Sequence, residues 1–354
     1  MKRIIYLLIS SITLFSTLNA HAQSPFSDLL KSGPGDATKL LNAYADPLFK
    51  GFGAGMNSGW NNTAKTKKLF HFDLRISATG AIVPSSDKTF DITKIGLSNH
   101  LGPQDPSQTV TPTFAGDKNV ASPTLNIYDD THQKVDEFKM PSGKLPIIPS
   151  PQVQLTVGLP HNTDITLRGI PKINLGSNVG SVSMIGVGLK HNIIQDFVGK
   201  KGSKIIPFDL AIVLAYSRLN MSVPLDVQPD GAQPENNQQA TDFTNQRFEG
   251  HFNSFLAQAI ISKKLLFFTP FFAVGYNTAS ANVAALGNYP VTTGENITGP
   301  TYTTFTNPIS INENTISGLR ADLGFQLNLA IFRIYASGSL AKYKSVSAGI
   351  GFGF

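Results

Sequence analysis

Regular alternation of apolar and polar residues constrains this chain more than any other feature of its sequence. Residues 70–79 read FHFDLRISAT, in which every second residue is apolar. Because successive side chains of a β-strand point to opposite faces, the pattern predicts a strand with one apolar and one polar face. The pattern predicts ten strands in all, the other nine lying at residues 152–159, 164–168, 184–189, 208–217, 248–261, 268–278, 319–328, 334–342 and 346–354.

Composition separates a membrane barrel from a soluble sandwich, since both contain alternating strands. Hydrophobic residues make up 41% of the chain and charged residues only 15%, yet after the N-terminus no apolar run is long enough to cross a bilayer as a helix. Strands with a lipid-facing side produce this mixture, and in hydrocarbon they cross only as a closed barrel, because every backbone polar group must be paired. We therefore expect an all-β fold, a transmembrane antiparallel β-barrel, and exclude a helical membrane protein.

The first 22 residues have the pattern of a secretory signal peptide. Lys2 and Arg3 precede an apolar run at residues 4–18, and small residues lead up to Ala22, after which we expect cleavage. The chain has no Cys, which excludes a lipoprotein anchor, disulfides and thiol chemistry. We therefore expect export through the inner membrane and location in the bacterial outer membrane.

Connection lengths predict the topology of the barrel. With a periplasmic N-terminus, odd-numbered strands run outward and every second connection is short. The long connections at residues 84–150, 224–246 and 279–311 then all lie on the extracellular side. The periplasmic connections fall at residues 160–163, 192–207, 262–266 and 330–332. Residues 124–128 and 134–138 could form a further hairpin, which would give twelve strands instead of ten. A second extra hairpin would give fourteen.

Residues 23–68 predict a short, partly helical segment ahead of the barrel domain at residues 69–354. Asp36 is the expected helix cap, and Pro47 with the glycines at 51, 53 and 55 is expected to end the helix. Glycines permit close backbone approach, which favours a plug inside or beneath the barrel over a loose periplasmic tail. The apolar plug residues are predicted to be Leu40, Leu41, Tyr44 and Phe52.

The C-terminal strand alternates up to a final phenylalanine. Ile350, Phe352 and Phe354 predict a signal recognised by the barrel-insertion machinery, although a last strand of a secreted sandwich would alternate as well. Other aromatic residues near strand ends predict interfacial girdles. They are Tyr216, Phe267, Phe268, Phe332, Tyr335 and Tyr343.

The net charge predicts the kind of partner. Removal of Lys2 and Arg3 with the signal lowers the formal charge from +6 to +4 (6 − 2 = 4). Export makes nucleic acid an implausible partner for this excess, whereas anionic outer-membrane lipid and lipopolysaccharide fit it.

Charged residues on the polar strand faces are predicted to line the lumen. Two interpretations are open: a charged lining that selects permeants, or ion-paired ladders that fill a narrow barrel. The pairs that could form such ladders are Asp73 with Arg75, Asp164 with Arg168, and Arg320 with Asp322. The second interpretation is favoured because side chains fill small barrels. The predicted lumenal residues are Asp73, Arg75, Asp164, Arg168, Arg320, Asp322 and Gln326.

Catalytic and metal-binding signatures are weak. The chain contains neither a GxSxG elbow nor an HExxH helix, and its histidines are scattered. The acidic residues at 129, 130, 136 and 137 lack EF-hand spacing. We therefore expect no enzymatic activity, no metal and no cofactor.

Two segments carry a resemblance to known barrels. Residues 51–91 (GFGAGMNSGWNNTAKTKKLFHFDLRISATGAIVPSSDKTFD) and residues 158–196 (GLPHNTDITLRGIPKINLGSNVGSVSMIGVGLKHNIIQD) resemble an uncharacterised outer-membrane β-barrel family of the Bacteroidota. More distantly, a helical segment ahead of a barrel is similar to the FadL-type transporters of hydrophobic compounds, whose fourteen-stranded barrel holds an N-terminal plug. The FadL resemblance is one of architecture alone.

These features predict a plugged outer-membrane barrel that binds a small solute or transports it down its concentration gradient, with hydrophobic solutes among the candidates. The alternative is a closed structural or interaction barrel whose long extracellular loops bind a partner. A barrel lipid hydrolase is a third, less favoured, interpretation.

Overall fold

A computed structural model describes residues 28–174, 180–203, 205–229 and 231–353. The expected signal peptide and Phe354 lie outside the described residues. Among the residues that are described, no helix combines the length and the apolar character needed to cross a membrane.

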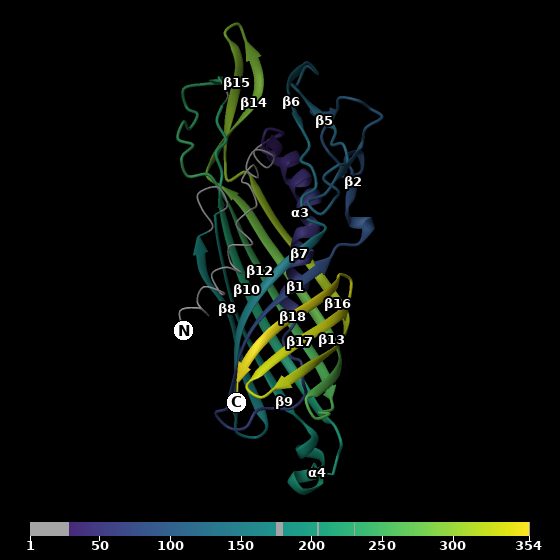
Figure 1. The fold of residues 1–354 in the computed structure, drawn as a ribbon. Helices are drawn as coiled ribbons and strands as arrows, with labels where there is room; N and C mark the ends of the chain where they lie inside the picture. The colour runs from purple at the N-terminus through teal and green to yellow at the C-terminus, as the bar shows by residue number, and fades with distance from the viewer. Residues whose placement is uncertain (1–27, 175–179, 204, 230, 354) are drawn as a thin grey trace.

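Within the described residues, ten antiparallel strands close into a barrel (Figure 1). β1 (Phe72–Ile82) pairs with β18 (Lys344–Gly353) on one side and with β7 (Ile147–Leu159) on the other, which closes the sheet. The fold class and the strand number expected from alternation are therefore confirmed. The remaining wall strands are β8 (Thr163–Asn174), β9 (Ser181–Asn192), β10 (Asp209–Pro224), β12 (Arg247–Ser262), β13 (Phe268–Leu286), β16 (Ile309–Leu329) and β17 (Phe332–Leu340).

Long connections gather at one end of the barrel, which we call the long-loop end (Figure 1). They fold into small sheets rather than adding strands to the wall. The extra hairpin does form, as β5 (Thr124–Tyr128) and β6 (Lys134–Lys139), but it pairs outside the barrel, so the twelve- and fourteen-strand alternatives are wrong. The other elements here are η1 (Ser85–Asp87), β2 (Thr89–Asp91), η2 (Ile92–Lys94), β3 (Leu101–Pro103), β4 (Val110–Pro112), β11 (Gln233–Pro234), β14 (Asn288–Asn296) and β15 (Gly299–Thr306).

The opposite end, the short-turn end, carries tight connections and one helix. Residues 160–162, 263–267 and 330–331 link neighbouring strands, and α4 (Ile194–Gly202) occupies the longer connection between β9 and β10. Several turn positions have a positive φ, among them Asn162, Leu266 and Ala330. This separation of long and short connections is the one predicted from their lengths.

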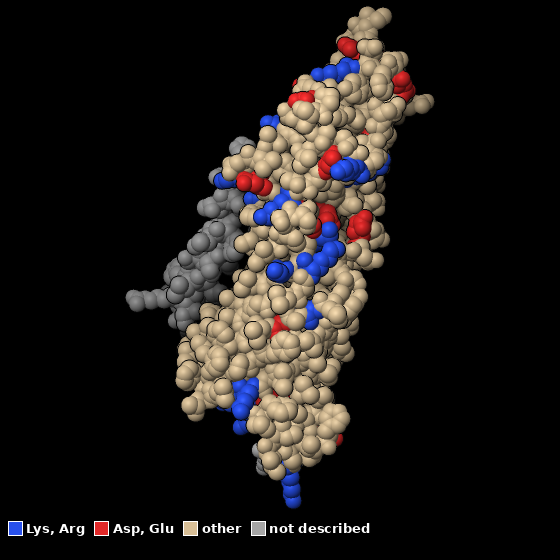
Figure 2. All heavy atoms as spheres, turned by 90° about the vertical axis from the view of Figure 1, so that its right-hand side faces the viewer, with Lys and Arg blue, Asp and Glu red and all other residues tan. Residues whose placement is uncertain are grey.

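The outer surface of the barrel wall is apolar. Side chains that alternate outward are exposed although they are aliphatic or aromatic, the arrangement that suits a lipid environment. Figure 2 shows few charged residues over the lower half of the face it draws, whereas charges gather toward the long-loop end. The exposed belt includes Leu74, Val153, Leu155, Leu167, Ile185, Val187, Ile212, Leu214, Phe255, Phe272, Val274, Leu319, Leu323, Val346, Ile350 and Phe352.

The predicted aromatic girdles need one correction. Tyr216, Phe267 and Phe332 are exposed on the outside, but Tyr335 and Tyr343 are 4% and 1% exposed. Both hydroxyls reach carboxylates, Tyr335 that of Asp73 and Tyr343 that of Asp87. A buried phenol needs a hydrogen-bond partner, and here Asp73 on the inner side of β1 and Asp87 of η1 provide it.

The helix α3 (Gly33–Asn57) is longer than the sequence predicts. Pro47 and the glycines do not end it, because the barrel wall surrounds this part of the helix and packs against it. Asp36 is not its cap either. The helix begins at Gly33, and the Asp36 carboxylate accepts hydrogen bonds from the backbone N–H and the hydroxyl of Ser98 instead.

Candidate functional site: the occupied lumen

The N-terminal chain passes through the whole barrel from the long-loop end to the short-turn end. Near the start of α3, the Lys39 ammonium donates to the carbonyl of Gly96 in a long loop. Further on, Ala64 N–H donates to Ser262 at the opposite end of β12, and Phe70 pairs with Gly158 beside β1. The described chain therefore starts at the long-loop end, whereas the sequence predicts that its start and the long loops lie at opposite ends. β1 runs toward the long-loop end, as predicted. We call residues 33–68 the plug.

The upper half of the lumen is apolar. Leu40, Leu41 and Phe49 of α3 pack against wall residues and loop residues in one continuous cluster. Phe252 of β12 contacts the rings of both Phe49 and Phe52, with centroids 5.6 and 5.3 Å apart. Burial of this apolar face stabilises the helix in the half of the barrel nearer the long-loop end.

Three glycines bring the lower half of α3 against the wall. A Cβ on Gly53 would lie 2.6 Å from the Ala279 side chain, and one on Gly55 would lie 2.5 Å from Ser150. Gly51 meets Ile148 just as closely. Such approaches leave no room for a side chain, so the spacing of these glycines fits the helix into a narrow barrel.

Arginines from three different strands converge on the C-terminal end of α3. Arg168 donates to the carbonyls of Met56 at 2.8 Å and Ser58 at 3.0 Å. Arg75 donates to the carbonyls at residues 59 and 60, and Arg320 donates to the Ser58 hydroxyl at 2.9 Å. The last carbonyls of a helix have no partners within it, and the helix dipole places negative charge there. Arg168 therefore satisfies one carbonyl of the last helical turn, and the three guanidinium groups place positive charge at this helix end.

Trp60, the only tryptophan of the chain, packs against the inner face of the barrel wall at β9. Its indole N–H donates to Met56, and the Arg168 guanidinium lies 3.7 Å from the ring centroid. Gly186 and Gly188 of β9 leave space for the ring, since a Cβ on either would lie about 3 Å from it. A cation stacked on an aromatic face is favourable when both are desolvated. Trp60 thus links the helix end to β8 and β9.

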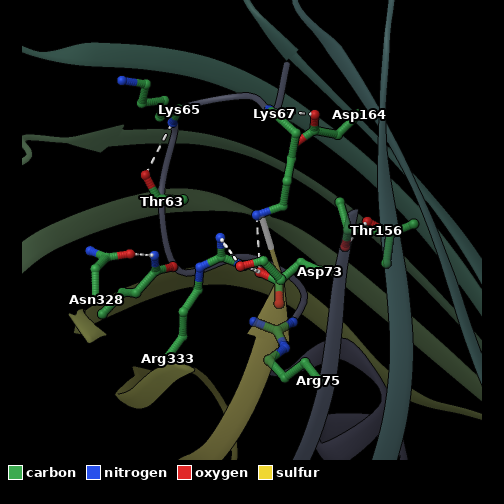
Figure 3. A network of polar contacts seen from close by, with 12 residues as sticks. Thr63, Lys65, Lys67, Asp73, Arg75, Thr156, Asp164, Asn328 and Arg333 are labelled. Carbon is green, nitrogen blue, oxygen red and sulfur yellow. Dashed lines mark hydrogen bonds and ion pairs between the residues drawn. The ribbon is translucent and has the colours of Figure 1, made fainter. Parts of the chain in front are cut away.

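A second charged cluster secures the plug near the short-turn end (Figure 3). The Lys67 ammonium lies 3.0 Å from the Asp73 carboxylate, which also pairs with Arg333 at 2.9 Å and accepts from the Tyr335 hydroxyl. Asp73 therefore joins the plug to two strands of the wall. Asp164, with no exposed surface, pairs with Lys190 at 2.9 Å and accepts from the backbone N–H of Lys67.

The predicted lumenal residues all face inward, but their partners differ from those expected. Of the three predicted pairs, only Arg320 with Asp322 forms, at 2.8 Å. Arg75 and Arg168 donate to carbonyls of the plug instead. Asp73 pairs with Lys67 and Arg333, and Asp164 pairs with Lys190. Asp73, Arg75, Asp164, Arg168, Arg320, Asp322 and Gln326 are at most 8% exposed.

The other predicted residues have these positions. Leu40, Leu41 and Tyr44 are buried on α3, while Phe52 is partly exposed. Ile350 lies on the outer belt. Sequence reasoning missed Trp60, Lys67, Lys190, Arg333 and Gln154 as parts of the lumenal network. Lys190 could have been found, since it continues the inward series of Gly186 and Gly188 on β9.

A cleft of about 400 Å³ opens beside α3 among the long loops. Its walls combine charged and apolar groups, including Lys39, Asp46 and Phe90. Asp87 lies at its edge and accepts a hydrogen bond from the Tyr343 hydroxyl at 2.7 Å. Burial acts to raise the pKa of the Asp87 carboxyl, but the bonds from Tyr343 and Ser86 and the nearby Lys50 ammonium outweigh it and lower that pKa.

A hydroxyl, an imidazole and a carboxylate meet at the short-turn end. The His191 ring lies 2.9 Å from the Thr163 hydroxyl and 2.8 Å from the Asp196 carboxylate. The Thr163 hydroxyl also donates to the His161 carbonyl. The contact fastens the start of α4 to β8 and β9.

A closed ten-stranded antiparallel barrel with an apolar outer belt, whose lumen holds its own N-terminal helix, defines a plugged transmembrane β-barrel. The chain belongs to the Family of unknown function (DUF6588), whose model matches residues 1–354. No curated protein matches the sequence.

Several solved barrels are similar to the chain. They include the outer membrane protease OmpT from Escherichia coli, which is 8% identical in sequence. The match covers 84% of this chain and 100% of the OmpT chain, with a TM-score of 0.33. The toluene transporter TodX of Pseudomonas putida has 9% identity, 88% and 75% coverage, and a TM-score of 0.29. Ail, the attachment invasion locus protein of Yersinia pestis, has 8% identity, 81% and 100% coverage, and a TM-score of 0.26. Because these values are low, the fold class rests on the strand pairing itself.

Proposed function

We propose that this protein is a closed outer-membrane barrel whose working surface is its long-loop end, at the cell surface, where it binds a partner. The observation that carries the proposal is the occupied lumen. The plug runs from one end of the barrel to the other and binds the wall through Arg75, Arg168 and Arg320 near its middle and Lys67 near its lower end. In the part of the chain that the structure describes, the plug fills the lumen, so the surface open to a partner is the folded loops and the cleft beside α3.

Transport through a displaced plug is the second candidate. The lower half of the plug is held by hydrogen bonds and ion pairs, which water can replace, together with apolar contacts of Trp60 and Ala64. A vacated lumen would be lined by Arg75, Arg168, Arg320, Lys190 and Arg333 against Asp73, Asp164 and Asp322, an excess of basic groups. Rings of basic side chains favour anions, so this alternative predicts a small anionic solute instead of a hydrophobic one. The FadL-type resemblance stays a prediction.

Current recording in planar lipid bilayers separates the two candidates. We expect no steady conductance from the full chain and a conducting state from a variant that lacks residues 33–68, because that segment fills the lumen. An Arg218→Ala variant, altered on the outer face where Arg218 bonds Asn220, serves as a control and should stay closed. Steady, anion-selective conductance of the full chain would support transport and contradict the closed barrel.

We also propose that the protein is not an enzyme. The Thr163–His191–Asp196 contact is the arrangement closest to a catalytic one, but the Thr163 hydroxyl bonds the His161 carbonyl, and His191 and Asp196 are more than a third exposed. A nucleophile needs its proton directed to the base. Hydrolysis of a p-nitrophenyl ester that is lost in Thr163→Val and His191→Gln variants would contradict this.

A further inference from the structure

Backbone pairing between β7 and β8 stops part of the way up the barrel wall. The two strands pair from Leu159 with Thr163 up to Val153 with Gly169. Above this point β7 continues along β1 as far as Ile147, and β8 continues along β9 as far as Asn174. The two strands separate there toward the long-loop end (Figure 1). We call this part of the wall, where residues 147–152 of β7 do not pair with residues 170–173 of β8, the seam.

Prolines occupy the positions that would continue the ladder. Gly158 exchanges backbone hydrogen bonds with Phe70 and His71, on the β1 side. Residues of an antiparallel strand direct their N–H groups alternately to either neighbour, so the odd-numbered residues of β7 face β8. Two positions above the Val153–Gly169 pair, Pro151 would face Pro171, and neither residue has an N–H. The sequence therefore ends this ladder at a defined rung.

The same prolines make an open edge tolerable beside lipid. An unpaired backbone N–H in hydrocarbon is costly, which is why membrane barrels normally lack free edges. At the seam, Pro149, Pro151 and Pro171 remove donors from the facing edges, and a bulge between Ile170 and Ile173 turns β8 aside. The outward side chains here are exposed and mostly apolar, as Ile147 at 50% exposure illustrates. The seam is therefore continuous with the apolar belt.

The plug presents an apolar face to the seam. Gly51 and Gly55 touch β7, while Phe49 packs on Phe252 of β12. With 3.6 residues per turn, Leu48 and Phe52 lie on the helix face between these contacts. The strands between β7 and β12 in the barrel are β8, β9 and β10. Phe52 also contacts Phe252 of β12, with ring centroids 5.3 Å apart. The Leu48 and Phe52 side chains are only partly buried, although they belong to the interior helix.

We propose that the seam is a lateral lipid-binding site, in which an acyl chain of an outer-leaflet membrane lipid enters between β7 and β8 and contacts Leu48 and Phe52. Three observations carry it: the ladder ends at paired prolines, the edge lacks donors at these positions, and a partly exposed apolar face lies behind it. Lys172, exposed on β8, is placed to meet the anionic headgroup of such a lipid.

Photolabelling from the lipid phase tests the site. The full chain is reconstituted in vesicles that contain a phospholipid with a diazirine at the end of one acyl chain, and labelled residues are located by mass spectrometry. We expect adducts on Leu48 or Phe52 in addition to the outer-belt residue Leu323. Phe49, which is only 5% exposed, should carry none. Absence of label on α3 while Leu323 is labelled, or equal label on Phe49 and Phe52, would overturn the proposal.

A double variant closes the seam. Pro151→Val with Pro171→Val restores two N–H donors at the facing positions and is expected to reduce label on α3 on the order of tenfold, since the restored rung adds two backbone hydrogen bonds. Label on Leu323 should not change. Pro270→Val in β13, where pairing with β16 is continuous, is the matched control and should leave α3 labelled. Undiminished label in a folded double variant would contradict entry through the seam; if the double variant does not fold, the wild-type pattern decides.

Discussion

Gly188 illustrates how a single residue in the wall depends on a single side chain in the lumen. A Cβ at this position would lie 2.9 Å from the Trp60 ring and at ordinary contact distance from Ala215. The ring is fixed by Arg168 and by its own indole hydrogen bond, so it cannot move aside easily.

Substitution Gly188→Ala is therefore expected to lower the free energy of unfolding by about 1–3 kcal/mol, the usual cost of overpacking. The measurement is denaturant unfolding in lipid vesicles. In a Trp60→Ala background the same substitution should cost little, because the clash is gone. Gly338→Ala, with no atom within 4 Å of the added Cβ, is the control. An equal cost of Gly188→Ala in both backgrounds would show that Trp60 is not its contact.

At the scale of elements, Asp87 ties three separate parts of the chain together. It lies in η1, accepts from Tyr343 in the β17–β18 connection, and lies 3.6 Å from the Lys50 ammonium of α3. The pKa of its carboxyl is held below the ordinary 3.8 although burial opposes this, because the Tyr343, Ser86 and Lys50 contacts favour the charged form.

This shift predicts how the contact responds to pH. A depressed pKa in the folded state contributes stability above the unfolded value of 3.8, and that contribution is lost as pH falls through the folded value. Wild type should therefore be more stable than Asp87→Asn at about pH 7, and the difference should shrink as pH falls below 3.8. Denaturant midpoints of the two proteins across this range provide the test. A constant difference would mean that the charge of Asp87 is not involved.

For the whole molecule, the direction of the plug determines at which end of the barrel the described chain begins. α3 starts among the long loops and the plug ends at the short-turn end. The chain therefore reaches β1 through the barrel rather than from beneath it.

A short epitope tag placed directly before Asp28 is accordingly expected to be accessible on intact cells, like a tag between residues 231 and 241 in the connection before β12. A tag at residues 263–266, at the short-turn end, should be protected until the outer membrane is opened. Added protease and antibody binding measure accessibility. If the tag before Asp28 is protected while the one before β12 is accessible, the plug enters from the other side.

Local sequence patterns are sufficient to predict the barrel fold and its number of wall strands. Alternation specifies which side chains face lipid and which face the lumen, because each strand has a period of two, and this was enough to count the wall strands and to place Asp73, Arg168 and Arg320 inside. Apolar composition without long runs excluded helical membrane spans. These are local properties, and each strand carries them independently.

The partners of the lumenal charged residues, in contrast, depend on the tertiary structure. Arg75 and Arg168 bind carbonyls of the plug, and Lys67 pairs with Asp73 across the lumen, contacts that depend on the path of residues 33–68 through the barrel. That path also keeps α3 helical beyond Pro47, because packing against the surrounding wall stabilises a helix whose proline and glycines have low helix propensity. No periodicity along the chain encodes which backbone segment fills a closed barrel, since that choice depends on the space left when all ten strands have met.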